Sequence, residues 1–310
     1  MPIAIVVHGG AINPLTEPFN SGVKNVVLAG YQILKRDGSA LDAVTEAVRL
    51  MEDNPIFNSG TGSWPNLAGE IEMDAIIVDG RDVSSGAVGC ISRVKNPILI
   101  ARKVMEETDH ILLVGEGATR FARSFGFPDY DPLTEERQTE WSALRDKVRK
   151  GETTSMMKYW SKISKFALAD TVGAVALSSK GDIAAATSSG GFPLKLPGRL
   201  GDVPILNCST YASNICGVSL SGHGEIIIRM TLARRIHDLV EAGESPQTAI
   251  ETAIREAINH LESREGVLMA GIALDKEGNV GMARNTDATP HAYISTSTDN
   301  RVLVGFGRVI

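Results

Sequence analysis

Two hydroxyl-bearing residues, Thr171 and Ser189, are spaced so that a nucleophile could lie between them. The short apolar runs 172–177 and 183–189 flank a loop centred on Lys180, which predicts a β-hairpin. Residues equally distant from Lys180 then face one another, so Thr171 faces Ser189 at the open end of the ladder. Thr–Ser cross-strand pairs are ordinary in sheets, so the spacing of this pair alone favours a structural role over a catalytic one.

Charged residues that could bind a small zwitterion follow in a Gly- and Pro-rich loop. Arg199 offers a planar fork suited to a carboxylate, and Asp202 offers a counter-charge for an ammonium group. A surface ion pair explains the same two residues equally well.

The sequence Ser221-Gly222 directly precedes a helix predicted to begin near Gly224. A backbone N–H and a hydroxyl at a helix N-terminus could stabilise an oxyanion, although the same pattern is also a plain helix cap. His223 and Glu225 resemble the His-x-Glu of zinc deaminases, but the Pro-Cys-x-x-Cys that should follow is missing. We therefore interpret His223 as a packing or surface residue.

Composition excludes several classes of function. The chain has 310 residues, 31 of them glycine, and a formal net charge of -6, which argues against a nucleic-acid-binding protein. No P-loop sequence occurs, and the three cysteines, Cys90, Cys208 and Cys216, form no zinc or disulfide pattern. The apolar run 1–7 is too short for a signal or membrane segment, so the expected location is the cytoplasm.

The elements that must position these residues alternate between hairpins and helices. The sequence predicts helices over about 23–36, 96–107, 118–125, 224–242 and 245–261, and a further helix capped by Ser39 whose apolar side runs from Leu41 to Leu50. It predicts strands near 70–76, 111–114, 172–177 and 183–189. A second hairpin around 273–280 repeats the layout of 176–183. The charged stretch 127–165 is typical of an exposed connector with some helix. This pattern indicates an α+β fold with antiparallel sheet.

Eight segments in register resemble the plant-type L-asparaginase and isoaspartyl peptidase family of N-terminal nucleophile hydrolases. They are Ile5–Ala11, Gly38–Val44, Asp53–Ser63, Glu72–Ala75, Asp170–Leu177, Ala184–Gly191, Lys195–Asp202 and Ser221–Glu225. The resemblance covers nearly the whole chain, and several motifs in order are far more specific than any one of them.

The resemblance implies one Ntn-hydrolase domain, residues 1–310, folded as a four-layer αββα sandwich. It also implies self-cleavage between Asp170 and Thr171 into an α subunit, 1–170, and a β subunit, 171–310, assembled as a dimer of αβ units. A threonine hydroxyl needs a base beside it, and the freed α-amine of Thr171, with a pKa of about 7.7 to 8.0, supplies one.

The family roles carry over as expectations about substrate and site. The substrate is expected to be L-asparagine or a β-aspartyl dipeptide, bound without any catalytic cofactor. The expected catalytic residues are Thr171, Ser189, Ser221 and Gly222, and the expected substrate-binding residues are Arg199, Asp202, Gly222, Gly224 and Asn58. A structural sodium ion is expected on the backbone carbonyls of Met51, Glu52, Asn54, Phe57, Ser59 and Thr61, where a plain glycine turn is the alternative.

Three departures from the family pattern leave a different class of function open. Ser189 and Ser221 stand where the family usually has threonine, and Asn207-Cys208-Ser209 stands where glycines are usual. The alternative is a weakly active or uncleaved homologue that binds amino acids or a protein partner without turnover. Glycosylasparaginase or protein-specific threonine protease activity is a further alternative within the family.

Overall fold

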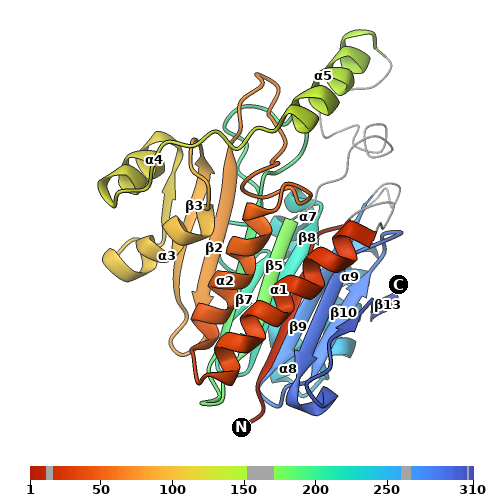
Figure 1. The fold of residues 1–310 in the computed structure, drawn as a ribbon. Helices are drawn as coiled ribbons and strands as arrows, with labels where there is room; N and C mark the ends of the chain where they lie inside the picture. Colours follow the sequence, from red (N-terminus) through yellow and green to blue (C-terminus); the bar gives the residue numbers. More distant parts are fainter. Residues whose placement is uncertain (12–16, 152–170, 260–266, 306) are drawn as a thin grey trace.

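The structure is a computed structural model that describes residues 1–11, 17–151, 171–259, 267–305 and 307–310. Its larger sheet has eight strands (Figure 1). In spatial order they are β12 (Leu303–Val304), β11 (His291–Ser295), β1 (Ala4–His8), β5 (Thr171–Leu177), β6 (Ile183–Ser189), β2 (Met73–Asp79), β3 (Ser84–Ile91) and β4 (Leu112–Val114). Every pairing is antiparallel except β3 with β4.

The smaller sheet packs against the larger one and has five strands. In spatial order they are β13 (Arg308–Val309), β10 (Val280–Arg284), β9 (Met269–Asp275), β8 (Cys216–Gly222) and β7 (Thr210–Ala212). Side chains from both sheets form one apolar cluster, in which Val6, Ile76 and Val175 meet Ile272 and Leu274. Strands β5 and β8, which carry the predicted nucleophile and its neighbours, therefore face each other across this interior.

Helices cover the outer face of each sheet. On the larger sheet these are α1 (Glu17–Lys35), α2 (Ala40–Asp53), α3 (Pro97–Glu107) and α4 (Gly115–Ser124), and α8 (Leu232–Glu241) and α9 (Pro246–Asn259) pack on the smaller sheet. Figure 1 shows α1 and α2 crossing in front of β5. A separate apolar core lies under each set of helices. The findings confirm a mixed α and β fold of helices and sheets.

The predicted N-terminus of α2 shows how local sequence sets these elements. The Ser39 hydroxyl accepts the N–H of Asp42 at 3.0 Å and donates to the Asp42 carboxylate at 2.7 Å. One otherwise unpaired N–H of the first turn is thereby satisfied. The helix beginning predicted from the sequence is confirmed.

Both predicted hairpins form, and they are built alike. Leu177 pairs with Ile183 and Leu274 pairs with Val280, so each loop contains five residues. Each loop is closed by an N–H to carbonyl bond across its base and turns through a glycine with φ near +86°, at Gly181 (+87°) and Gly278 (+85°). The weak repeat in the sequence therefore reflects a repeated hairpin.

One helix prediction is wrong, because residues 224–242 form two helices. The first is α7 (Gly224–Met230), and α8 begins after Thr231, whose φ of +44° interrupts the helical path. The first N–H groups of α8, on Ala233 and Arg234, donate to the carbonyls of Cys208 and Asn207. These bonds satisfy the new helix end, and they depend on a loop about 25 residues away that helical periodicity does not report.

Helix α5 (Glu135–Arg149) lies in the charged stretch that was predicted to be an exposed connector with some helix. The helix is present, but Trp141 and Leu144 are buried against Trp64, Phe192 and Leu194. The connector is therefore docked on the domain at this point. None of the helices in the described residues combines the length and apolar character of a membrane span.

Candidate active site

Thr171 and Ser189 face each other as the hairpin geometry predicts. They are paired across β5 and β6, and the Thr171 hydroxyl donates to Ser189 Oγ at 3.1 Å. Ser189 Oγ also accepts the N–H of Gly191 at 3.0 Å. Both side chains are buried, so the hydroxyl pair is fixed by the ladder and by the loop that follows it. The predicted cleavage partner Asp170 lies outside the described residues.

Ser221 reaches Thr171 from the other sheet. Its Oγ accepts the N–H of Ala11 at 3.2 Å and that of Thr171 at 3.4 Å. The hydroxyl therefore lies beside the nitrogen that would become the free amine after cleavage. The sequence predicted this hydroxyl to stabilise an oxyanion, which stays a prediction, and the structure adds its contact with the Thr171 nitrogen.

The two predicted glycines beyond β8 are required by close packing. Gly222 has a φ of +143°, and a Cβ there would overlap the carbonyl oxygen of Leu268. A Cβ on Gly224 would overlap the Asp202 carboxylate. Glycine at 222 therefore lets β8 pack against the backbone of Leu268, and glycine at 224 leaves room for the side chains of Asp202 and Arg199.

Arg199 lies over the ring of Phe192, with its guanidinium carbon 4.4 Å from the ring centroid. Its Nε donates to Glu225 Oε1 at 3.1 Å, and its Nη2 lies 3.0 Å from the same oxygen. Glu225 was not among the predicted site residues. The available signal was its position directly after Gly224, which puts it in the first turn of α7.

Asp202 is buried, and its desolvation raises the pKa of the carboxyl to about 7, although the nearby Arg199 guanidinium acts in the opposite direction. Two buried carboxylate oxygens without a hydrogen-bond partner in the described structure lie here, Asp202 Oδ2 and Glu225 Oε2, and Arg199 Nη2 makes only its ion-pair contact with Glu225 Oε1. Buried charged atoms with missing or imperfect hydrogen bonds are costly unless a ligand pairs with them. The arrangement suits a small molecule with a carboxylate and an ammonium group.

Asn58 lies next to residues 190 and 191, which follow Ser189 and are here called the nucleophile loop. Its amide already makes hydrogen bonds within the protein. Its Nδ2 donates to the Gly191 carbonyl at 2.8 Å, and its Oδ1 accepts the N–H of Trp64 at 2.9 Å. A Cβ on Gly190 would overlap this side chain. In this structure Asn58 therefore supports the loop after Ser189.

The predicted sodium-binding segment, residues 51–61 and here called the ion loop, is closed by hydrogen bonds between backbone groups. The carbonyls of Met51, Glu52 and Asn54 accept N–H groups from Asn54, Thr61 and Phe57 at 3.2, 2.8 and 3.1 Å. A carbonyl oxygen has a second lone pair, so these bonds still allow coordination of a cation. The Glu52 side chain is buried, and this burial raises the pKa of its carboxyl to about 8 while the Ile98 N–H acts against the shift.

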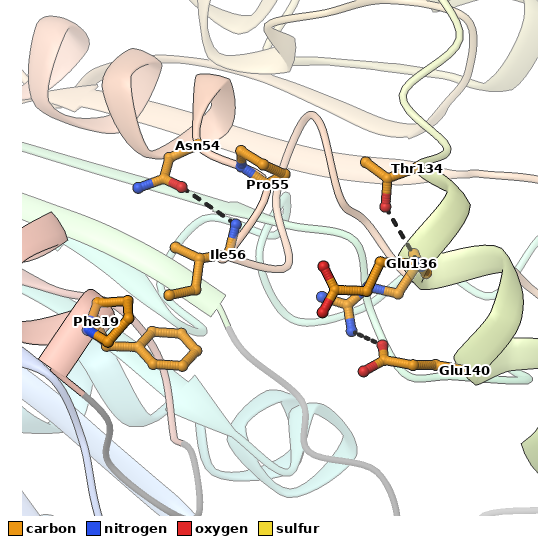
Figure 2. Close-up of a pocket in the computed structure, with 9 residues that line it drawn as sticks. Phe19, Asn54, Pro55, Ile56, Thr134, Glu136 and Glu140 are labelled. Carbon is orange, nitrogen blue, oxygen red and sulfur yellow. Dashed lines mark hydrogen bonds and ion pairs between the residues drawn. The ribbon is translucent and has the colours of Figure 1, made fainter.

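A cavity of about 580 Å³ adjoins this loop (Figure 2). Its walls come from the beginning of α1, the segment 54–56 and the beginning of α5, including Phe19, Glu136 and Glu140. Thr171, Arg199 and Asp202 do not line it. The cavity is therefore separate from the group of candidate catalytic residues.

A network of buried polar groups links the two sheets behind the nucleophile. His8 Nε2 lies 2.9 Å from Ser219 Oγ, which is 2.7 Å from Thr187 Oγ1. Burial lowers the pKa of His8 to about 3, with neighbouring His291 adding to the shift. The imidazole is therefore neutral at physiological pH and serves to align β1, β6 and β8.

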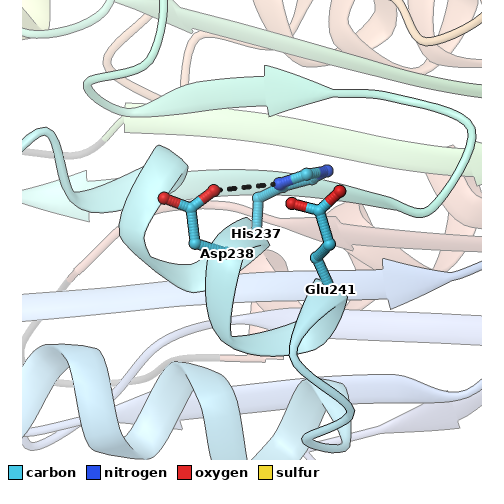
Figure 3. Close-up of side chains that lie close together, drawn as sticks. All are labelled: His237, Asp238 and Glu241. Carbon is cyan, nitrogen blue, oxygen red and sulfur yellow. Dashed lines mark hydrogen bonds and ion pairs between the residues drawn. The ribbon is translucent and has the colours of Figure 1, made fainter.

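A group of potential metal ligands, His237, Asp238 and Glu241, lies on α8 (Figure 3). The ring nitrogens of His237 already lie 2.7 Å from Ser213 Oγ and 3.4 Å from Asp238 Oδ1. Arg234 also pairs with Asp238 at 2.7 Å. The two carboxylates are exposed, so this group carries no argument for a metal site.

Comparison with known proteins identifies the relatives of the chain. A family model described as asparaginase matches residues 1–304. The plant-type L-asparaginase of Thermococcus kodakarensis is 47% identical over 308 residues, covering 96% of this chain and 97% of the relative. The plant-type L-asparaginase of Pyrococcus abyssi is 46% identical over 303 residues, covering 94% and 96%. The human isoaspartyl peptidase/L-asparaginase is 40% identical over 283 residues, covering 89% and 87%.

Proposed function

Because this chain belongs to the asparaginase family, we propose that it is a self-processing amidohydrolase acting on L-asparagine, on β-aspartyl dipeptides, or on both. The observation that carries the proposal is the surroundings of Thr171. Its hydroxyl bonds to Ser189 and its nitrogen bonds to Ser221, so a nucleophile and a base on one residue have separate partners.

The first step is cleavage of the peptide bond before Thr171, which converts its nitrogen into an α-amine. Near pH 8 a large share of such amines is neutral and can accept the hydroxyl proton. Thr171 Oγ1 then attacks the side-chain carbonyl carbon of the substrate. The amine returns the proton to the leaving nitrogen, which departs as ammonia or as the amine of the second amino acid. Water hydrolyses the remaining ester and regenerates Thr171.

Other residues hold the substrate during these steps. The Arg199 guanidinium binds the α-carboxylate, and ionised Asp202 binds the α-ammonium, while the glycines at 222 and 224 let the substrate approach the backbone. We assign the tetrahedral oxyanion to the N–H of Gly222, at the end of β8.

We infer that residues 1–310 form one four-layer αββα domain, which cleavage divides into 1–170 and 171–310. Helices on the outer faces of two packed sheets support this arrangement. No cofactor takes part in the chemistry. A sodium ion on the carbonyls of the ion loop, a dimer of αβ units and a cytoplasmic location complete the proposal.

Two measurements test the function on purified protein. Intact mass after incubation should show two fragments, 1–170 and 171–310, which arise by cleavage between residues 170 and 171. The cleaved protein should release ammonia from L-asparagine or aspartate from a β-aspartyl dipeptide. Thr171→Ala should stop cleavage and lower activity about 10⁴-fold or more. Thr139→Ala, on the exposed face of α5, is the matched control and should behave like the parent. A persistently single chain without activity on either substrate would contradict the proposal and favour a binding role without turnover.

A further inference from the structure

Lys195 is a buried lysine whose ammonium is bound by backbone carbonyl groups. Only 4% of the residue is exposed, and its Nζ donates to the carbonyl oxygens of Glu72 at 2.6 Å and Gly190 at 3.0 Å. Burial lowers the pKa of this ammonium, and nearby Asp74 acts against the shift. A lysine is rarely buried without a specific role, because its desolvation is costly.

One of its two acceptors belongs to the loop that supports the nucleophile. Gly190 follows Ser189 directly, and a Cβ on Gly191 would lie 2.9 Å from Nζ, so the backbone lies directly against the ammonium. The Gly191 N–H donates to Ser189 Oγ, the acceptor of the Thr171 hydroxyl. The ammonium is thus connected to the nucleophile through one short piece of backbone.

The other acceptor, Glu72, lies just before β2, and this strand end holds the loop of residues 196–202 around Arg199, here called the substrate loop. The Glu72 carboxylate accepts the N–H of Gly198 at 2.9 and 3.1 Å. Two residues later, Asp74 accepts the N–H of Gly201 at 3.0 Å. These bonds fix the backbone on both sides of Arg199.

We propose that Lys195 is a positioning residue of the reaction, which sets the distance between the nucleophile loop and the substrate loop through Gly190 and Glu72. The inference rests on the proposed function. L-Asparagine is short, so anchoring its α-carboxylate on Arg199 also fixes where its side-chain carbonyl meets Thr171. A displacement of about 1 Å between reacting atoms can cost about 100-fold in rate.

The first test replaces the ammonium with an apolar chain of similar length. Lys195→Met should lower kcat about 10- to 100-fold and raise KM, because both loops lose their common donor. Rates are divided by the cleaved fraction from intact mass, since slower self-cleavage would otherwise be counted as slower turnover. Lys276→Met, on the exposed β9–β10 loop, is the control and should match the parent. A folded Lys195→Met protein with a lower melting temperature but unchanged kcat and KM would overturn the proposal.

The second test keeps the lysine and weakens the link between Glu72 and the substrate loop, together with the bond that Glu72 accepts from Asn66 Nδ2. Glu72→Gln retains the backbone carbonyl that Lys195 binds but removes the charged acceptor of Gly198. A neutral amide accepts the Gly198 N–H more weakly than the carboxylate does. KM should therefore rise about 3- to 10-fold, while kcat stays within about twofold. An unchanged KM would overturn the proposal even if Lys195→Met does not fold. A parent protein inactive on both substrates would instead reject the proposed function, which distinguishes the two failures.

Discussion

The nucleophile region and the substrate loop of this protein are held in place by different kinds of bonds. Thr171 lies within a sheet, where its position follows from the β5–β6 ladder and from one hydroxyl on each side. Arg199 lies on an irregular loop, whose backbone N–H groups donate to Glu72, just before β2, and to Asp74 in β2. The first region is built by regular local structure, and the second by single side-chain contacts from distant sequence.

This difference predicts different consequences of mutation. In the nucleophile region the hydroxyls of Thr171, Ser189 and Ser221 already have protein partners, so the loss of one of them leaves a buried group unsatisfied. In the substrate loop several charged atoms have no hydrogen-bond partner in the described structure and should gain one from the substrate. Mutations in the first region should therefore act mainly on kcat, and those in the second mainly on KM.

Among variants that keep the Thr171 nucleophile, the largest effect is expected at Ser189. Ser189→Ala removes the acceptor of both the Thr171 hydroxyl and the Gly191 N–H, and it should lower kcat about 100-fold. Ser189→Thr keeps a hydroxyl at this position, on the threonine that the family usually has. Its kcat should therefore stay within a few-fold of that of the parent. Steady-state kinetics on cleaved protein measure both. Ser85→Ala removes a buried strand hydroxyl that has no hydrogen-bond partner among the described residues, and it serves as the control.

An equal loss of kcat in the Ser85→Ala and Ser189→Ala variants would contradict this view. It would mean that any buried serine lost from the larger sheet disturbs the site. The special position of Ser189 across the ladder from Thr171 would then carry no weight.

A smaller effect, confined to binding, is expected at Arg199. Arg199→Lys keeps the charge but loses the planar fork and the stacking on Phe192, so kcat/KM should fall about 10- to 50-fold, mostly through KM. Arg234→Lys is a matched control, because Arg234 also lies over an aromatic ring, Tyr211, and pairs with a carboxylate. If Arg199→Lys lowered kcat with KM unchanged, this would contradict the view that the substrate loop acts mainly on KM and the nucleophile region mainly on kcat.

The same contrast explains what the sequence could predict. The facing of Thr171 and Ser189 followed from hairpin arithmetic alone, since a ladder fixes register over its whole length. The family resemblance added the identity of Arg199 and Asp202. The support of their loop by Glu72, Asp74 and Lys195 could not be predicted, because no periodicity links residues more than 100 positions apart.

Two further features lay beyond the sequence for related reasons. The break at Thr231 depends on carbonyls of residues 207 and 208, which meet the new helix end only in the folded chain. The burial of Trp141 depends on Trp64, Phe192 and Leu194, which come from two separate loops. Composition correctly indicated a helix in a charged stretch, but it could not reveal which face of that helix is covered.

The smallest effect is a pH dependence that belongs to the substrate loop. Burial raises the pKa of Asp202 to about 7, and Glu225 and Asp74 add to the shift while Arg199 opposes it. Below pH 7 the carboxyl is increasingly protonated and cannot pair with the α-ammonium. We expect KM to rise about tenfold between pH 8 and pH 6, since the limiting slope below the pKa is tenfold per unit. In Asp202→Asn, KM should be high at every pH and should lose this slope.

The effect of Asp202 on stability has the opposite sign. Its folded pKa lies above the unfolded value near 3.9, so its ionisation disfavours the folded state. The stability that this group contributes is complete below about pH 4 and is lost as pH rises to 7. Asp202→Asn should therefore raise the melting temperature of the substrate-free protein at pH 8 while it weakens substrate binding there. A parent KM that stays flat from pH 6 to 8, or an Asn variant that is less stable at pH 8, would show that Asp202 is ionised without substrate. The charged groups of the substrate loop would then be stabilised by the protein without substrate, as the hydroxyls of the nucleophile region are.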